Sequence, residues 1–195
     1  MKQFCDLTLA DWIDCLESRH NQEIQLGLSR VKECAAQLGL LQVEACVITV
    51  SGTNGKGSTV AALEAIYIAA GYEVASYTSP HLLQFNERIR INNQPISDTD
   101  LCAAFTAISQ SSNANQLTYF EMTTLAALWH FKQLELDVVI LEVGLGGRLD
   151  ATNIIDPNLA IITTVDFDHQ EYLGHTQEEI GYEKAGILRP DIPFI

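Results

Sequence analysis

The stretch VITVSGTNGKGS, residues 47–58, decides the fold of this chain. It runs from an apolar, β-type segment through a loop with three glycines and one lysine into an alanine-rich helix. Gly52, Gly55 and Gly57 have no Cβ atom, so backbone N–H groups can turn inward and approach an anion closely. The positive N-terminal end of the helix would point at the same place, and Lys56 would add a mobile charge. This pattern predicts a phosphate-binding loop.

The loop departs from the G-x-x-x-x-G-K-[ST] pattern at two positions. Val50 stands where the first glycine is usual, and Gly57 separates Lys56 from Ser58. An ordinary glycine-rich turn therefore stays open as an alternative. The context favours phosphate binding, because a helix that we expect to begin at Ser58 leads into a second apolar strand at 73–78. A strand–helix–strand unit of this kind has a right-handed crossover.

Two further apolar runs follow, DVVILEVG at 137–144 and LAIITTVD at 159–166. Unbroken runs of this length are typical of parallel strands that are buried on both faces. Glu142 lies near the end of the first run, and the acidic and imidazole groups of residues 166–169 follow the second. Ligands bind at the carboxyl ends of such strands, and these groups suit Mg-ATP. The fold class that we predict is α/β, a P-loop-type, mostly parallel sheet flanked by helices.

The remaining periodicity predicts helices at about 9–17, 28–38, 98–111, 121–134 and 176–186, a hairpin within 81–97 around Asn92 and Asn93, and a polar surface loop at 111–116. We expect residues 1–40 to form a helical segment packed on the ATP-binding domain. The apolar run at 192–195 reads as the opening of another strand.

Composition limits the partners of the chain. Its net charge is −14, which excludes nucleic acid and anionic membranes as favourable partners. We expect a cytoplasmic protein, because no stretch has the apolarity of a membrane span and the N-terminus lacks a secretory signal. Five scattered cysteines without a CxxC pair are expected to be reduced thiols. Local cations can still focus positive potential in a cleft, and five of the eleven fall in or beside the motifs: Lys56, Arg88, Arg90, Arg148 and Lys184.

Six motifs, in order along essentially the whole chain, resemble those of the folylpolyglutamate synthase family, including its bifunctional dihydrofolate synthase/folylpolyglutamate synthases. They are SGTNGKGS (51–58), YTSPHL (77–82), LTYFE (117–121), LEVGLGGRLDATN (141–153), DHQEYLG (168–174) and EKAGI (183–187). That family belongs to the Mur-ligase-like ATP-dependent amide ligases. GTNGK is shared by the whole superfamily, whereas TSPHL, TYFE and LEVGLGGRLDATN are specific to the folate branch.

The resemblance implies an ATP site and a metal site. The ATP-binding residues would be Thr53, Asn54, Gly55, Lys56, Gly57 and Ser58. Two Mg²⁺ ions would be held by Ser79, Glu142 and His169. The catalytic residues would be Lys56, Glu142, His169 and Lys184, the last as an N-carboxylated lysine.

Most of these residues also have ordinary structural explanations that involve no ligand. Ser79 suits a turn before Pro80, and His169 suits an ordinary polar position. Lys184 is a favourable cation in the last turn of a helix. Glu142 is harder to explain without a metal, because an unpaired carboxylate on a buried strand would cost several kcal/mol or stay protonated.

The resemblance also implies a pterin pocket. Its residues would be Leu26, Gly27, Leu28, Thr118, Tyr119, Phe120, Glu121, Leu149, Asp150 and Ala151. Phe120 would offer a flat face to the ring, with a buried core aromatic as the alternative. Ser29 departs from the family pattern, which often has an acidic residue at that position.

The implied reaction is ATP-dependent addition of L-glutamate to dihydropteroate and to reduced folates through an acyl phosphate. The resemblance further implies that the 195 residues are an ATP-binding domain that stops before its end, that a C-terminal glutamate-ligase domain is absent, and that the full-length protein is a monomer. Two rivals stay open. A cell-wall Mur ligase shares the nucleotide chemistry, and a non-catalytic nucleotide-binding fragment would share only the loop.

Overall fold

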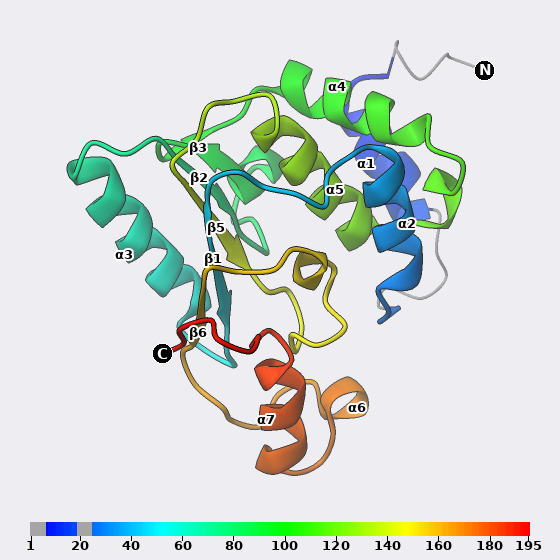
Figure 1. Ribbon diagram of the computed structural model, residues 1–195. Coiled ribbons are helices and arrows are strands. Elements are labelled where there is room, and N and C mark those ends of the chain that lie inside the picture. Colours follow the sequence, from blue (N-terminus) through cyan, green and yellow to red (C-terminus); the bar gives the residue numbers. More distant parts are fainter. Residues whose placement is uncertain (1–6, 19–24) are drawn as a thin grey trace.

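The computed structural model describes residues 7–18 and 25–195. Within them, the strands form one sheet of six in the order β4-β3-β2-β5-β1-β6 (Figure 1). The strands are β1 (Cys46–Ser51), β2 (Val74–Tyr77), β3 (Ile89–Ile91), β4 (Gln94–Pro95), β5 (Val138–Glu142) and β6 (Leu159–Ile162). The neighbours β2, β5, β1 and β6 are parallel, whereas β3 and β4 pair antiparallel at one edge. The predicted fold class is confirmed.

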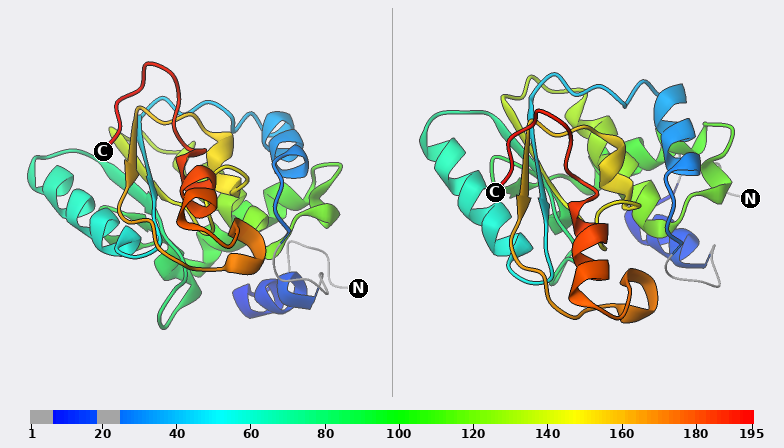
Figure 2. Two further views of the ribbon diagram at one scale, coloured as in Figure 1. Left: turned by 90° about the horizontal axis from the view of Figure 1, so that it is seen from below. Right: turned by 60° about the horizontal axis from the view of Figure 1, so that its bottom comes forward.

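Helices cover both faces of this sheet (Figures 1 and 2). On one face lie α1 (Leu9–Ser18), α2 (Ser29–Gln37), α4 (Asp98–Ser109) and α5 (Tyr119–Phe131). On the other lies α3 (Lys56–Ala69). The short α6 (Gln170–Leu173) and α7 (Gln177–Ala185) sit beyond the carboxyl ends of the parallel strands. Single 3-10 turns occur at η2 (Phe85–Arg88), η3 (Ala114–Gln116) and η4 (Ala151–Ile154).

Alternation along β1 and β5 sends their side chains into two core clusters on opposite faces of the sheet. On β1, Val47 packs into the large cluster under α1, α2, α4 and α5, whereas Ile48 and Val50 face α3. On β5, Val139 faces the first side and Ile140 the second. Successive strand residues point to opposite faces, so both sets must be apolar, as the unbroken runs predicted.

Several predicted boundaries were wrong, each for a local reason. The helix after the loop begins at Lys56 instead of Ser58, because Gly55 takes a left-handed φ of 83° as its N-cap. The run 159–166 is strand only to Ile162, since the residues after it turn to bind the loop. The expected surface loop 111–116 contains η3, with Ala114 buried.

The expected hairpin is confirmed, whereas the expected start of the next-but-one helix is wrong by two residues. The hairpin turns at Asn92 and Asn93, which both have positive φ, and joins β3 to β4. The helix expected at 121–134 begins at Tyr119, because Thr118 and Glu121 form a reciprocal capping box.

The chain end pairs with the sheet. Residues 193–195 run parallel to β6 and exchange three backbone hydrogen bonds with it, at Ala160 and Ile162. In the described part of the molecule, no helix has the length and apolarity needed to cross a bilayer. Cys5 and parts of the expected segment 1–40 lie outside the described residues.

Candidate active site

The backbone of the glycine loop has positive φ angles at two of its glycines. Gly52 has φ of 148° and Gly55 φ of 83°, values that side-chain-bearing residues rarely adopt. A Cβ at Gly52 would collide with the side chain of Thr163. Because α3 begins at Lys56, its first backbone N–H groups lack intrahelical partners and project at the loop.

A segment that we did not predict holds this loop in place. Residues 163–166 follow β6, the neighbour of β1, and we call them the strap. The Thr53 N–H donates to the Thr164 carbonyl at 2.9 Å, and the Asn54 N–H donates to Thr164 Oγ1 at 2.9 Å. Thr163 Oγ1 donates to the Asn54 carbonyl at 2.6 Å. The sequence signal for this contact was the pair of hydroxyl residues Thr163 and Thr164, which directly follow β6.

The strap divides the predicted ATP residues into two kinds. Thr53 and Asn54 use their backbone N–H groups to bind the strap, and Thr53 Oγ1 also accepts from the Asp166 N–H at 3.0 Å. Among the loop and cap hydrogen bonds of the described residues, none is donated by the N–H groups of residues 55–58. Lys56 folds back over the loop, where its Nζ donates to the carbonyls of Gly52 at 2.8 Å and Thr53 at 3.3 Å.

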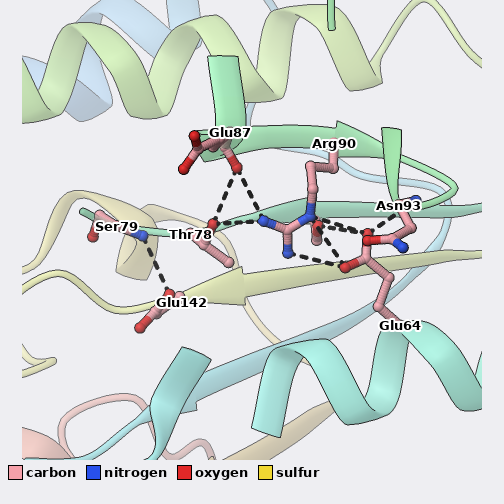
Figure 3. Close-up of polar contacts among 8 residues, drawn as sticks. Glu64, Thr78, Ser79, Glu87, Arg90, Asn93 and Glu142 are labelled. Atoms are coloured by element: carbon pink, nitrogen blue, oxygen red, sulfur yellow. Dashed lines mark hydrogen bonds and ion pairs between the residues drawn. The ribbon is translucent and has the colours of Figure 1, made fainter. Parts of the chain in front are cut away.

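Glu142 and Ser79 are brought together beside the start of α3. The Ser79 N–H donates to Glu142 Oε2 at 3.2 Å (Figure 3). A Cβ built at Gly57 would lie 3.8 Å from Glu142 Oε1, so the carboxylate borders the loop. Burial raises the pKa of Glu142, while the Ser79 N–H, Lys56 and Arg90 oppose that rise.

His169, in contrast, lies in an open position. Its side chain is 46% exposed, its φ is 42°, and its Nε2 is 3.6 Å from Asp168 Oδ1. Over residues 7–18 and 25–195, no three His, Cys, Asp or Glu side chains form a group that could hold a metal. The predicted ligand set contains only two residues of these types, with the Ser79 hydroxyl as its third donor. The structure pairs Glu142 with Ser79 and records no contact from either to His169 in the described chain.

Lys184 is buried in the last turn of α7. Desolvation, together with the nearby charge of Lys56, lowers the pKa of Lys184 to about 8, and Asp168 opposes the shift. A depressed pKa of this kind increases the fraction of neutral amine at physiological pH, which is the form that reacts with CO₂.

The predicted pterin residues come from three segments that meet. The Gly27 N–H donates to the Leu149 carbonyl at 3.4 Å, which joins the first segment to the third. Arg30, two residues after the first segment, has its Nε 2.8 Å from Glu121 Oε2, which links that part of the chain to the second segment. Half-buried Phe120 packs on Gly144, where a Cβ would lie 2.5 Å from its ring.

Two acidic residues of this group have different surroundings. Asp150 accepts four hydrogen bonds, from the N–H groups of Gly144, Leu145 and Thr152 and from the Thr152 hydroxyl. Burial raises the pKa of Asp150 and these bonds oppose the rise. Glu121 uses Oε2 for the capping box and for Arg30, while its buried Oε1 has no hydrogen-bond partner in the described chain. An unmet buried acceptor costs about 1–3 kcal/mol, so Oε1 is suited to a ligand's N–H group.

Arg88 is a further buried cation beside this group. It is 8% exposed, its guanidinium lies over the rings of Phe85 and Tyr119, and its Nε donates to His81 Nδ1 at 2.9 Å. No acidic partner is recorded for it among the ion pairs of the described residues. The motif position of Arg88 drew attention to it, but no sequence pattern showed its burial.

The chain is similar to known proteins in sequence and in fold. A family model described as the Mur ligase middle domain matches residues 50–190. The chain is 52% identical over 187 residues to an Escherichia coli dihydrofolate synthase/folylpolyglutamate synthase, covering 96% of this chain and 44% of that protein. It is 54% identical to the Haemophilus influenzae protein of the same name, covering 96% and 43%. The chain thus spans less than half the length of these relatives.

Solved structures show the same relationship. The Yersinia pestis bifunctional folylpolyglutamate synthase/dihydrofolate synthase complexed with AMPPNP and Mn has a TM-score of 0.92 at 50% identity, covering 100% of this chain and 47% of that one. E. coli FolC in complex with DHPP and ADP has a TM-score of 0.91 at 48% identity, covering 99% and 49%.

Proposed function

This chain belongs to the Mur ligase family through its middle domain, and we propose from this premise that it is the ATP-binding part of a dihydrofolate synthase/folylpolyglutamate synthase. The observation that carries the proposal is that two candidate sites lie next to each other at the carboxyl ends of the parallel strands. The loop of residues 52–58 borders Glu142, and the three segments of the pterin group meet close to the same strand end.

The donor set fits ATP with a divalent cation. The N–H groups of residues 55–58 and the Lys56 ammonium would hold phosphate oxygens. Glu142 is a buried carboxylate that accepts one hydrogen bond within the described chain, so it has oxygen lone pairs left for a hard cation. Ser79 and Glu142 would hold Mg²⁺, with His169 as the third ligand and a second ion nearby. When bound, Mg²⁺ neutralises phosphate charge.

The proposed reaction proceeds by phosphoryl transfer. A carboxylate oxygen of dihydropteroate or a reduced folate attacks the γ-phosphorus of ATP, giving an acyl phosphate and ADP. The amine of L-glutamate then attacks the acyl carbon, releasing phosphate and a proton as the amide forms. Positioning and charge neutralisation dominate such a transfer, so no covalent protein nucleophile is needed. Since the relatives are more than twice as long, we infer that this chain binds substrates but does not complete ligation alone.

The buried acceptor Glu121 Oε1 supports a pterin as the acid substrate, because pterin rings present N–H donors. Half-buried Phe120, whose ring centroid lies 5.9 Å from that of Tyr77, would offer an aromatic face to the pterin ring. A cell-wall Mur ligase would share the phosphate loop but would lack these pterin-type residues.

A thermal-shift measurement separates these alternatives. Dihydropteroate should raise the melting temperature of the chain in the presence of Mg-ADP, whereas UDP-muramoyl peptide substrates should not, because a ligand stabilises only the state it binds. A shift with the muramoyl compounds alone would favour the Mur ligase. No shift with any nucleotide would refute the ATP site itself.

We also propose that Lys184 is carboxylated. The Lys184 ammonium first loses a proton. Its neutral Nζ then attacks CO₂, an N–C bond forms and a second proton is released, so that a buried cation becomes an anion beside Lys56. Intact mass spectrometry in bicarbonate above pH 8 should find one added CO₂, and Lys184→Met should abolish it. An unmodified mass under these conditions would contradict the proposal.

A further inference from the structure

The helix that starts at the phosphate loop buries a carboxylate two turns later. Glu64 of α3 is 1% exposed. A buried charge is costly unless it is paired and hydrogen-bonded. Its carboxylate accepts from Ser76 Oγ at 3.0 Å, from the Asn93 N–H at 3.2 Å, and from Arg90 Nη2 at 2.9 Å and Nε at 3.2 Å. These contacts connect α3 to β2, β3 and the hairpin turn.

Arg90 reaches in a second direction with its remaining nitrogen. Nη1 donates to Thr78 Oγ1 at 3.1 Å and to the Glu87 carbonyl at 3.0 Å (Figure 3). The guanidinium is planar with donors in a fixed fork, so one side chain sets the position of Glu64 relative to Thr78.

Thr78 directly precedes Ser79, whose N–H binds Glu142 Oε2. The Thr78 N–H is also bound, to the Arg88 carbonyl at 2.8 Å. A continuous path therefore runs from α3 through Glu64, Arg90 and Thr78 to the Ser79–Glu142 pair. Glu142 in turn borders Gly57 at the start of α3.

We propose that Arg90 is a positioning residue that fixes the Thr78–Ser79 turn relative to the phosphate-loop helix, and so sets the spacing between the phosphate loop and the cation ligands Ser79 and Glu142. This role rests on the proposed function of those residues. Arg90 touches neither nucleotide nor cation and acts through Thr78 and Glu64.

If Arg90 only formed an ion pair with Glu64, a lysine at this position would leave the Thr78–Ser79 turn unchanged. In Arg90→Lys, a single ammonium can pair with Glu64 but cannot also hold Thr78 and Glu87. The substitution keeps the positive charge but loses the forked arrangement of guanidinium donors. The matched control is Arg189→Lys, in which another arginine, bound to Asp156 and Asn153, undergoes the same change away from this path.

Amide hydrogen exchange of the unliganded chain is the first measurement. Arg90→Lys should speed exchange at the Ser79 N–H by about fivefold or more while the β5 amides Val139 and Ile140 stay as in the unaltered chain. Arg189→Lys should leave all three unchanged. Equal acceleration of all amides would mean general destabilisation and would overturn the positioning role.

Cation affinity is the second measurement. Mn²⁺ binding in the presence of ADP, followed by electron paramagnetic resonance, should weaken about tenfold in Arg90→Lys, with less than about threefold change in ADP affinity without metal. Unchanged Mn²⁺ affinity would overturn the inference while leaving the proposed function intact. Failure of the unaltered chain to bind either ADP or Mn²⁺ would refute the proposed function, and the inference with it.

Discussion

Helices α3 and α5 pack on opposite faces of one sheet by different means. Of its thirteen residues α5 buries nine, since α2 and α4 cover it, whereas α3 buries only Val60 and Glu64 of fourteen. One of these two is a carboxylate with four donors. Apolar contact is non-directional, while hydrogen bonds fix distance and angle. The helix that carries the phosphate loop is thus placed by directional bonds in addition to its apolar contacts, whereas α5 is placed mainly by buried area.

The largest expected effect lies in α5. Leu125 is completely buried, so Leu125→Ala should lower the free energy of unfolding by about 2–5 kcal/mol through lost transfer energy and a residual cavity. The matched change on α3 is at Leu63, which is only partly buried, and should cost about 1 kcal/mol. Urea unfolding measures both. Equal losses would break the comparison, because α3 would then depend on apolar packing as much as α5 does.

The next effect is on the α3 network. Ser76→Ala removes a buried hydrogen bond to the Glu64 carboxylate and should cost about 1.5–3 kcal/mol. Ser109→Ala on α4 removes only a bond to its own helix and is the control, with an expected loss below about 1 kcal/mol. If the two variants unfold at the same urea concentration, the Glu64 network does not hold α3.

A smaller effect is expected where the strap holds the loop. Thr163→Val keeps the side-chain shape but loses the bond to the Asn54 carbonyl, at a cost of about 1 kcal/mol. The loss in the free energy of ADP binding should exceed this loss in the free energy of unfolding, since the loop is no longer held. Thr163→Ser should restore the affinity. Full affinity in the valine variant would show that the loop keeps its shape without the strap.

The smallest change in stability is expected at Lys56. Lys56→Ala removes two bonds to loop carbonyls and should cost less than about 1 kcal/mol. Its affinity for Mg-ATP, measured by calorimetry, should nevertheless fall by at least tenfold, or about 1.4 kcal/mol. Undiminished ATP binding would refute the assignment of the phosphate loop.

Local signals in the sequence were sufficient for most of the fold. Unbroken apolar runs predicted the parallel strands, because such strands are buried on both faces. The glycines of the loop predicted its backbone shape, and Asn92 and Asn93 predicted the hairpin turn. Boundaries failed where a cap decided them, as at Gly55 and Thr118, since caps depend on single hydrogen bonds that periodicity does not show.

The sequence by itself determined which residues can carry chemistry: Lys56 in a glycine loop, Glu142 on a buried strand, and a set of motifs resembling one ligase family. Only the tertiary structure decided how they meet. It paired Ser79 with Glu142, left His169 exposed, and gave the backbone N–H groups of Thr53 and Asn54 to the strap. It also joined Glu64 to Arg90, residues 26 positions apart. Such contacts follow from strand order and the packing of distant segments, which no local pattern of residues encodes.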